Sequence, residues 1–296
     1  MRVGIAGLGK MGSALAEHLL GSGCDVTVWD RTRDRIEAVT ARGAHAAASP
    51  EALVQGMDAV IAMLWDDGAA REITLAQIIP SASPPTIVIE MSTLSPGMYK
   101  TLGEAAGRKG LGFLASPVLG SVDLARSGKL IALASGAEET FTRAKPLLEM
   151  LASTVTYVGP TGSSAYLKLA NNAIIGVVAE TLHELLKFCT RAGIDEGVAI
   201  DSLTAAFGRN ASAKVQQLHA HDTAPRFSLG ALYKDLQLAR DAGVSIDAPL
   251  PLLDVILPAV RRGVERGLAD RDYISLVFTD ATDEGRVIPE RAKIES

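Results

Sequence analysis

The stretch Val-Gly-Ile-Ala-Gly-Leu-Gly-Lys-Met-Gly, residues 3–12, decides the fold that the rest of the chain must fit. Its apolar start leads into Gly7, Gly9 and Gly12, which have the G-x-G-x-x-G spacing of a dinucleotide-binding turn. The first glycine permits a tight turn, the second lets a pyrophosphate approach the backbone, and the third lets a helix pack closely on the strand. The N-terminus of that helix offers N–H groups to the phosphates.

The residues around this turn follow the order strand, turn, helix, strand and acid. A helix-like run covers 13–20, and a second strand is predicted at 25–29, directly before Asp30. This acid lies at roughly the 20-residue offset expected of a residue that binds ribose hydroxyls. A glycine-rich turn without a nucleotide is the alternative, but the complete context favours a dinucleotide site.

The residues at the end of the second strand favour two different cofactors. Asp30 would accept hydrogen bonds from the ribose hydroxyls of NAD and would repel the 2′-phosphate of NADP. Arg31, Thr32 and Arg33 would instead bind that phosphate through charge-assisted hydrogen bonds. Because two guanidinium groups and a hydroxyl outnumber one acid, we expect NADP to be favoured over NAD. If the arginines are ordinary solvated residues, NAD is the alternative.

Composition limits the class of protein. The chain has 296 residues, of which 48% are hydrophobic, so it can form one large or two medium domains. The net charge is −5 and no basic block stands out, so we expect neither nucleic acid nor an anionic membrane as the main partner. Cys24 and Cys189 have no C-x-x-C spacing and the histidines form no ligand pattern. We therefore expect no metal, no disulfide framework and a reducing, cytoplasmic location.

The first half of the chain alternates strand-like and helix-like segments. This alternation predicts an α/β fold, a Rossmann-type doubly wound parallel sheet with helices on both faces. Strands are expected at 3–6, 26–29, 59–64, 86–90, 112–115, 130–134 and 155–158. Helices are expected near 11–21, 32–42, 50–56, 68–78, 97–109 and 138–151.

The character of the sequence changes after the Gly-Pro-Thr-Gly turn at 159–162. A long helix is predicted over 164–191, followed by helices near 195–206, 211–220, 228–243 and 250–267. We therefore expect a dinucleotide-binding domain over 1–160 and an all-helical substrate and dimerisation domain over 161–296. The apolar surface of the long helix predicts a homodimer. The polar tail after residue 278 is expected to be poorly ordered or docked on a partner.

Lys168 and Asn172 are candidates for catalysis. They are four residues apart on the long helix and share one face. Their neighbours are mostly small or apolar, which predicts a buried lysine, and burial lowers the pKa of a lysine. A lowered pKa suits a general acid and base near neutral pH. The alternative is a surface lysine whose amine reaches solvent along the helix.

Two further segments are weaker candidates. Residues 115–121 follow a predicted strand and include Ser116, Leu119, Gly120 and Ser121, at the edge of the sheet where α/β proteins bind ligands. A plain turn is equally compatible with that segment. Lys234 and Asp235 are adjacent on a predicted helix and point different ways, so they need not pair. A surface lysine and an interhelical salt bridge would then account for them.

Over residues 1–280 these motifs resemble the β-hydroxyacid dehydrogenase family, which includes 3-hydroxyisobutyrate dehydrogenases, tartronate semialdehyde reductases and glyoxylate/succinic semialdehyde reductases. The residues that match the nucleotide turn of the family are Gly7, Leu8, Gly9, Lys10, Met11 and Gly12. Segments 63–67 and 92–96 look like the two loops that border the cofactor in the family. The resemblance implies that Leu64 lies beside the cofactor and that Thr93 lies near the nicotinamide ribose.

The resemblance also implies roles in catalysis and substrate binding. The run from Gly162 through Lys168 to Asn171 and Asn172 matches the catalytic signature of the family, in which the lysine donates and accepts the proton. Asn171 is implied to contact the substrate. Lys234 matches a lysine that lies close to both cofactor and substrate in the family.

One departure from the family concerns the substrate loop. The family usually has Asp-Ala-Pro-Val-Ser-Gly-Gly, but here Leu119 stands at the position of the serine that binds a substrate carboxylate. Losing one oriented hydrogen bond to a charged group costs about 1.5–3 kcal/mol, and a leucine suits a bulkier or less polar substrate. Gly120 and Ser121 resemble the glyoxylate reductase branch, and backbone N–H groups of the loop would still bind an anion.

The function expected from these features is that of an NAD(P)-dependent oxidoreductase. It would transfer hydride between a nicotinamide cofactor and a hydroxy acid, semialdehyde or related carbonyl compound, with Lys168 as general acid and base and no metal. An NADPH-dependent imine reductase is one alternative, although those relatives commonly have aspartate or tyrosine in place of the lysine. A non-catalytic nucleotide-binding protein is the other.

Overall fold

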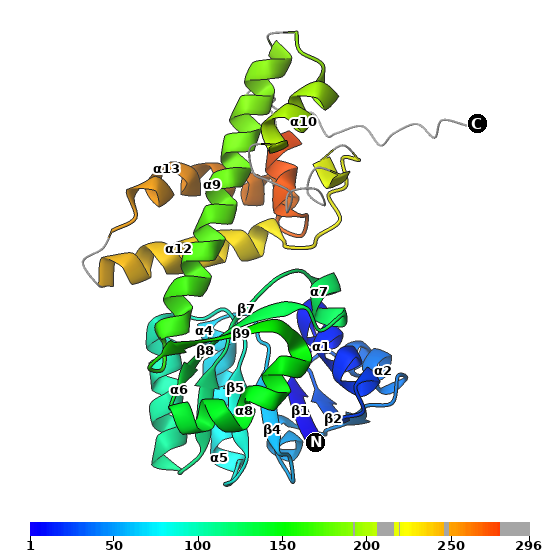
Figure 1. The fold of residues 1–296 in the computed structure, drawn as a ribbon, viewed down its shortest axis with the longest axis vertical. Helices are drawn as coiled ribbons and strands as arrows, with labels where there is room; N and C mark the ends of the chain where they lie inside the picture. The colour runs from blue at the N-terminus through cyan, green and yellow to red at the C-terminus, as the bar shows by residue number, and fades with distance from the viewer. Residues whose placement is uncertain (192, 206–215, 219, 246–248, 279–296) are drawn as a thin grey trace. The chain divides into compact units, whose positions relative to one another are not determined.

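The computed structural model describes residues 1–191, 193–205, 216–218, 220–245 and 249–278 (Figure 1). The chain divides into two compact units, Met1–Asn171 with Asp241–Asp247, and Asn172–Arg240 with Ala248–Ser296. The long helix α9, Ser163–Arg191, passes from one unit to the other. The helix expected at 211–220 lies mostly outside the described residues, and the tail after residue 278 lies wholly outside them.

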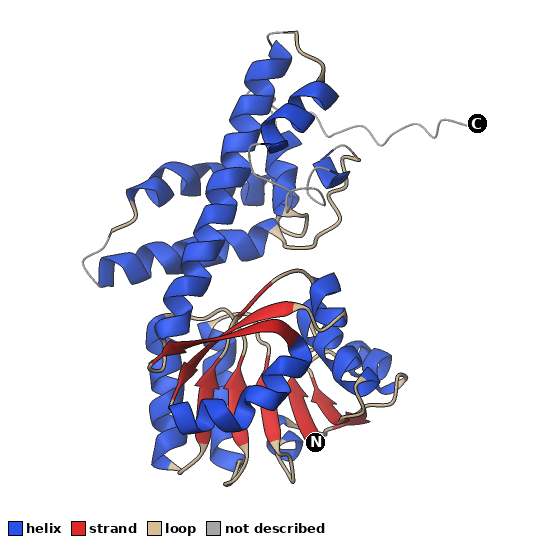
Figure 2. Cartoon of the chain, in the orientation of Figure 1, coloured by secondary structure: helices blue, strands red, loops and turns tan. Residues whose placement is uncertain are grey.

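The first unit is built on one sheet with helices packed against it (Figure 2). The order of its strands is β3-β2-β1-β4-β5-β6-β8-β7, and β9 pairs with β8. The strands are β1 Arg2–Ala6, β2 Asp25–Trp29, β3 His45–Ala46, β4 Ala59–Ala62, β5 Ile87–Glu90, β6 Gly112–Ala115, β7 Val118–Leu119, β8 Leu130–Gly136 and β9 Ala152–Gly159. In the parallel part Ala6 stands opposite both Trp29 and Ala62, so the carboxyl ends of β1, β2 and β4 meet at one edge.

The expectation of a wholly parallel sheet was wrong at one side. Strand β8 runs antiparallel to β6 and β7, and β9 is parallel to β8. The segment between β6 and β8 contains only the two-residue β7 and the five-residue helix α7, Val122–Arg126. A parallel crossover usually needs a long helix, so this segment returns the chain in the opposite direction.

Helices cover both faces of the sheet. Side chains alternate along each strand, so Ile61 and Ile89 belong to one apolar core whereas Val60 and Val88 belong to the other. All four residues of β4 are buried, as expected of a central parallel strand. The helices of this unit are α1 Lys10–Gly21, α2 Arg33–Thr40, α3 Pro50–Leu53, α4 Asp67–Ala70, the π-helix η1 Arg71–Ile78, α5 Ile79–Ser81, α6 Pro96–Arg108, α7 and α8 Glu138–Leu151.

The second unit is helical in the part that the structure describes. Besides the C-terminal part of α9, it contains α10 Glu196–Ala205, most of α12 Leu229–Ser245, α13 Pro251–Gly263, the π-helix η3 Val264–Leu268 and the 3₁₀ helix η4 Tyr273–Phe278. A smaller apolar core includes Leu182, Leu186 and Ile200. The expected order, a doubly wound α/β domain followed by a helical region, is therefore confirmed.

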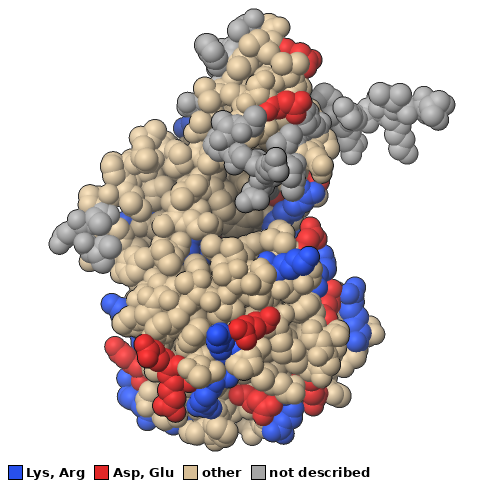
Figure 3. Space-filling model, viewed as in Figure 1, with Lys and Arg blue, Asp and Glu red and all other residues tan. Residues whose placement is uncertain are grey.

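The surface charge and the hydropathy of the helices bear on whether the protein binds nucleic acid or crosses a membrane. On the face of the first unit in Figure 3, basic and acidic side chains are interspersed, and the formal net charge of the chain is −5. Of the helices in the described ranges, none combines the length and the apolar character needed to cross a membrane.

Candidate dinucleotide and substrate site

The three glycines of the opening motif differ in what surrounds them in the folded chain. At Gly7, where φ is +95°, an added Cβ would lie 2.3 Å from the carbonyl oxygen of Met63. At Gly12 an added Cβ would lie 1.9 Å from the carbonyl oxygen of Gly7, so only glycine fits at either position. At Gly9 no atom lies within 4 Å of an added Cβ. The backbone of Gly9 therefore faces open space into which a ligand can approach closely.

The N-terminus of α1 fits an anion. Its N-cap residue, Gly9, makes no side-chain cap hydrogen bond, and no acidic residue occupies the first turn. In contrast, Asp66, Ser95 and Ser121 cap α4, α6 and α7 with their side chains. A helix N-terminus has backbone N–H groups without intrahelical partners and a positive dipole end. The glycine turn and α1 together therefore fit a pyrophosphate.

Asp30 lies inward against the glycine turn. It is 9% exposed, its Oδ2 accepts a hydrogen bond of 2.7 Å from the N–H of Leu8, and its Oδ1 accepts one of 2.7 Å from the N–H of Thr32. Arg35 Nη1 lies 3.7 Å from Oδ2 of the same carboxylate. The sequence did not single out Arg35, although it lies in the first turns of α2. The hydrogen bond from Leu8 therefore connects the end of β2 to the glycine turn.

The basic side chains that follow Asp30 are at the surface. The side chains of Arg31 and Arg33 are 69% and 89% exposed. Arg31 Nη1 lies 4.0 Å from Glu72, and Arg33 Nε lies 3.1 Å from Glu37. Pairs this exposed contribute little to stability, so both guanidinium groups can turn to a phosphate at small cost.

Hydrogen bonds join the two loops that resemble the cofactor border. The N–H of Leu64 donates to Ser92 Oγ at 2.6 Å. Asp67 accepts from the N–H of Ser95 at 2.9 Å and from Ser95 Oγ at 2.5 Å. Thr93 lies in the loop between these contacts. The carboxyl ends of β4 and β5 therefore hold Leu64 and Thr93 in one connected frame.

Glu90, the last residue of β5, is a polar residue of this region that the sequence did not single out. It is fully buried, and its oxygens accept hydrogen bonds from Thr74 Oγ1 at 2.7 Å, from the N–H of Ser92 at 3.3 Å and from Ser92 Oγ. Burial raises the pKa of Glu90 to about 7, against the hydrogen bonds from Ser92 and Thr74, which lower it. An acid at the end of an otherwise apolar strand was the signal that could have identified it.

The candidate substrate segment forms defined structure instead of a plain turn. Leu119 is in β7 opposite Ile131, and Gly120 follows with a φ of +130°. Ser121 Oγ accepts from the N–H of Leu124 at 3.4 Å, so this hydroxyl caps α7. Ser116 is fully buried, and its Oγ has no hydrogen-bond partner among the described residues. A buried hydroxyl without a partner is unusual and is consistent with a ligand that supplies one.

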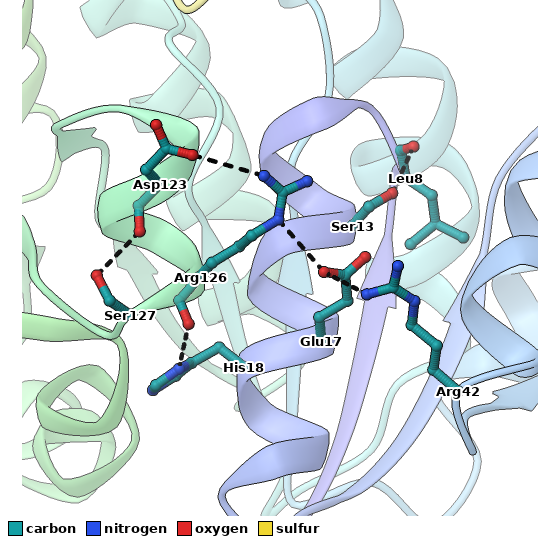
Figure 4. Close-up of polar contacts among 8 residues, drawn as sticks. All are labelled: Leu8, Ser13, Glu17, His18, Arg42, Asp123, Arg126 and Ser127. Carbon is teal, nitrogen blue, oxygen red and sulfur yellow. Dashed lines mark hydrogen bonds and ion pairs between the residues drawn. The ribbon is translucent and has the colours of Figure 1, made fainter.

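A polar cluster attaches α7 to α1 (Figure 4). Arg126 of α7 lies 3.4 Å from Glu17 of α1, and Glu17 also pairs with Arg42 at 2.8 Å. The ring nitrogens of His18 lie 2.9 Å from the carbonyl oxygen of Arg126 and 2.8 Å from that of Met150. The helix that follows the substrate segment and the helix that begins at the glycine turn are therefore held together.

Lys168 lies near the start of α9 and is partly exposed, so it is less buried than the sequence predicted. Ala165 and Leu169, four residues apart, form the buried face of this part of the helix, and Lys168 lies about 100° around the helix from Leu169. Ser164 Oγ fixes the helix start, because it lies 2.8 Å from Ser135 Oγ and 3.3 Å from the carbonyl oxygen of Ala115.

Asn172 is buried within the second unit by a contact with α12. It is 1% exposed, and its Nδ2 donates a hydrogen bond to Asp235 Oδ2. Lys234 Nζ lies 2.9 Å from Asp235 Oδ1, so these neighbours pair, although their positions on the helix did not require it. A lysine side chain is long enough to fold back over the helix surface to the next residue. Asn171, the preceding residue of α9, is partly exposed.

No metal site accompanies this arrangement in the part of the chain that the structure describes. No group of three or more His, Cys, Asp or Glu residues within the described ranges could hold a metal ion.

Comparison with known protein families covers nearly the whole chain. Residues 2–159 match the NAD binding domain of 6-phosphogluconate dehydrogenase. Residues 162–278 match a family described as the NAD-binding domain of NADP-dependent 3-hydroxyisobutyrate dehydrogenase.

Individual relatives extend over the same length. The chain is 30% identical over 284 residues to an uncharacterized oxidoreductase of Bacillus subtilis, covering 94% of this chain and 99% of the relative. It is 29% identical over 281 residues to glyoxylate/succinic semialdehyde reductase 1 of Arabidopsis thaliana, covering 94% and 97%. A solved structure of 3-hydroxyisobutyrate dehydrogenase from Salmonella typhimurium matches with a TM-score of 0.84 at 28% identity, covering 94% and 99%.

An imine reductase from Pseudomonas sp. shares the fold, with a TM-score of 0.64 at 20% identity, covering 93% of this chain and 97% of that one. This similarity to imine reductases concerns the fold alone. The family matches establish more, because they are matches of sequence that together cover both units and include the glycine turn and the Lys168 segment. The chain therefore belongs to the NAD(P)-dependent β-hydroxyacid dehydrogenase family of oxidoreductases, whose members act on hydroxyl groups.

Proposed function

We propose that this protein is an NADP-preferring reductase or dehydrogenase that transfers hydride between the cofactor and a hydroxy acid, semialdehyde or related carbonyl compound. The observation that carries the proposal is the open backbone of Gly9 at the uncapped N-terminus of α1, which fits a pyrophosphate. The other turn residues of the proposed cofactor site are Gly7, Leu8, Lys10, Met11 and Gly12.

The proposed chemistry divides the work between cofactor and protein. A bound nicotinamide supplies or accepts the hydride. Lys168 gives a proton to the carbonyl oxygen of the substrate, or takes one from the alcohol in the reverse direction. Asn172 positions the substrate or the ammonium group. Its Nδ2 already donates to Asp235, which fixes the amide plane and leaves the amide oxygen as an acceptor.

The preference for NADP is supported by the different positions of the acid and the arginines. Both oxygens of Asp30 already accept backbone hydrogen bonds, whereas the side chains of Arg31 and Arg33 are exposed beside it. Thr32 follows the acid at the start of α2. Charge-assisted hydrogen bonds from these residues would bind a 2′-phosphate.

Calorimetric titration of the wild type with NADP⁺ and NAD⁺ tests this preference. We expect tighter binding of NADP⁺. The double variant Arg31→Ala/Arg33→Ala should weaken NADP⁺ binding by about 10²–10⁴-fold, since it removes two donor side chains and hydrogen bonds to charged groups contribute about 1.5–3 kcal/mol each. Its affinity for NAD⁺ should change little. Equal affinities of the wild type for both cofactors would contradict the preference.

The proposed substrate is bulkier or less polar than a short hydroxy acid. Leu119 has no hydroxyl to bind a carboxylate, and Ser121 Oγ is engaged as the cap of α7. The buried Ser116 hydroxyl has no partner among the described residues, which supports a polar substrate group near it. Gly120 and Asn171 complete the proposed substrate contacts.

A turnover assay tests the reaction itself. The wild type is assayed with NADPH against a panel of semialdehydes, 2-oxo acids and a cyclic imine. We expect reduction of carbonyl compounds, and Lys168→Ala should lower kcat by about 10²–10⁴-fold while the Kd for NADP⁺ stays unchanged. Reduction of the imine alone would favour the imine reductase alternative. Unchanged turnover in Lys168→Ala would remove the lysine from the mechanism.

We also propose that the protein is a cytoplasmic homodimer formed through the second unit. Ile174 of α9 and Leu252 and Val255 of α13 are 63%, 66% and 73% exposed, which is unusual for aliphatic side chains and supports an interface. Cys24 and Cys189 are both free, which supports a reducing compartment.

A further inference from the structure

A buried hydrogen-bond chain joins the ends of two neighbouring strands. Just after β4, the N–H of Leu64 donates to Ser92 Oγ at 2.6 Å. Ser92 Oγ donates in turn to Glu90 Oε1 at the end of β5. From η1, Thr74 Oγ1 donates to the other carboxyl oxygen, Oε2, at 2.7 Å. Glu90 and Thr74 are 0% exposed and Ser92 is 1% exposed, so water does not compete for the side-chain bonds at the Glu90 carboxyl.

All the hydrogen bonds at the Glu90 carboxyl in this arrangement are donated to it. They come from Thr74 Oγ1, from Ser92 Oγ and from the N–H of Ser92. Such an arrangement suits an ionised carboxylate, which only accepts. A protonated carboxyl has to donate, so Thr74 or Ser92 must turn its own hydroxyl hydrogen away. Ser92 also accepts from Leu64, so a change at Ser92 reaches the loop that follows β4.

The groups around Glu90 come from several elements. Asp67 of α4 is a charged neighbour, and its negative charge adds to the effect of burial in raising the pKa of Glu90 to about 7. Tyr99 of α6 donates its hydroxyl hydrogen to the carbonyl oxygen of Ser92, which also holds the loop that contains Thr93. The N–H of Ser116, after β6, donates to the backbone oxygen of Glu90 at 2.8 Å.

We propose that Glu90 is a positioning residue for cofactor binding, whose carboxylate holds Ser92 and, through it, keeps Leu64 and Thr93 in the geometry that receives the cofactor. Protonation of Glu90 reverses a hydroxyl in the chain, loosens both loops and weakens binding. The inference rests on the proposed function, because it takes Leu64 and Thr93 as cofactor contacts. It adds a residue that touches neither cofactor nor substrate and acts through Ser92.

The test is the pH dependence of NADP⁺ binding, measured by calorimetry between pH 5.5 and about 8.5, a range that brackets the usual titration range of a perturbed carboxyl. The 2′-phosphate of NADP⁺ itself titrates near pH 6 on the scale of phosphomonoesters, roughly as in phosphoserine. The informative quantity is therefore the ratio of the Kd values of wild type and Glu90→Gln at each pH. We expect the wild-type Kd to rise several-fold relative to the variant as the pH falls through 7.

A matched control is Glu104→Gln on α6, where the glutamate is exposed, and this variant should follow the wild type at every pH.

A second pair of variants, at Thr74, isolates the hydrogen bond to Oε2 of Glu90. Thr74→Val removes the donor at similar volume and should move the midpoint of the binding profile to higher pH, because the charged form loses a hydrogen bond. Thr74→Ser keeps the hydroxyl and should keep the midpoint. Circular dichroism checks that each variant is folded. If Glu90→Gln does not fold, the comparison of Thr74→Val with Thr74→Ser provides the test.

Two outcomes separate this inference from the proposed function. If the wild type binds NADP⁺ but Glu90→Gln and Thr74→Val give profiles parallel to it, the role of Glu90 is overturned and the proposed function stands. If the wild type binds neither NADP⁺ nor NAD⁺ at any pH, the proposed function fails, and this inference fails with it.

Discussion

At the scale of single residues, Gly9 and Gly12 show that the same residue type can serve binding at one position and packing at another. A Cβ at Gly12 would collide with the backbone of Gly7, whereas a Cβ at Gly9 would meet nothing within 4 Å. The G-x-G-x-x-G spacing in the sequence cannot make this distinction, because it depends on what lies around each backbone position in the folded chain.

The two glycines therefore make a matched pair of alanine variants. Gly12→Ala should lower the free energy of unfolding by about 1–3 kcal/mol, as overpacking does. Gly9→Ala should change it by less than about 1 kcal/mol, the scale of N-cap effects, yet weaken NADP⁺ binding at least tenfold, because its methyl group occupies the path of the pyrophosphate. Urea denaturation and calorimetric titration measure the two quantities. Wild-type affinity in Gly9→Ala would show that the cofactor does not approach this backbone.

Leu119 stands at the position where the resemblance to the family implies a serine. Leu119→Ser should restore a hydroxyl that binds a carboxylate and should raise kcat/KM for short hydroxy acids or semialdehydes by about 10- to 100-fold, since such a hydrogen bond contributes roughly 1.5–3 kcal/mol. Steady-state kinetics with NADPH or NADP⁺ checks this result. Leu124→Ser, on the neighbouring helix α7, is the control and should leave kcat/KM unchanged. A loss of activity in Leu119→Ser would instead indicate that the leucine contacts the natural substrate.

At the scale of elements, the end of β5 makes folding stability depend on pH, because a titratable carboxyl is buried there. Glu90 places a carboxyl where the strand is fully buried, and burial raises its pKa from 4.5 to about 7. The folded state therefore binds a proton that the unfolded state releases between these two pH values. Stability is highest below about pH 4.5 with respect to this group, falls as the pH rises, and becomes level above pH 7.

The size of this effect follows from the two pKa values. Unfolding of the cofactor-free wild type should become easier by roughly 3 kcal/mol between pH 4.5 and 7 on account of Glu90. Glu90→Gln should lack this part of the slope, whereas Glu104→Gln should retain it. Urea denaturation at a series of pH values gives the comparison, and the difference between the two variants removes the contribution of the histidines. Identical slopes would mean that Glu90 titrates near its ordinary value.

Helix α9 and strand β8 show where periodicity in sequence was informative and where it was not. The predicted helix over 164–191 corresponds closely to the observed Ser163–Arg191. Its apolar pattern did not reveal which stripe would be buried, so the side chain of Lys168 is more exposed than expected. Strand β8 was expected in nearly the right place, but its antiparallel direction depends on the path of a connection that has little periodicity of its own.

At the scale of the whole molecule, exposed aliphatic side chains of the second unit support the proposed homodimer. We predict that the wild type sediments as a dimer and that Ile174→Asp/Val255→Asp sediments as a monomer, because charges in an apolar interface are costly to bury. Analytical ultracentrifugation at several concentrations measures this change. Leu124→Asp, which alters an exposed leucine of the first unit, should remain dimeric. A monomeric wild type would remove the proposed interface.

The sequence by itself determined the dinucleotide turn, the alternation of strands and helices, the change to an all-helical region and the family. These features depend on local backbone geometry and on side-chain periodicity, which act over a few residues. Only the tertiary structure decided which polar groups meet. Leu64 and Ser92 are 28 residues apart, and Asn172 and Asp235 are 63 residues apart. Such contacts depend on strand order and on side-chain direction after packing, and these are properties of the assembled fold.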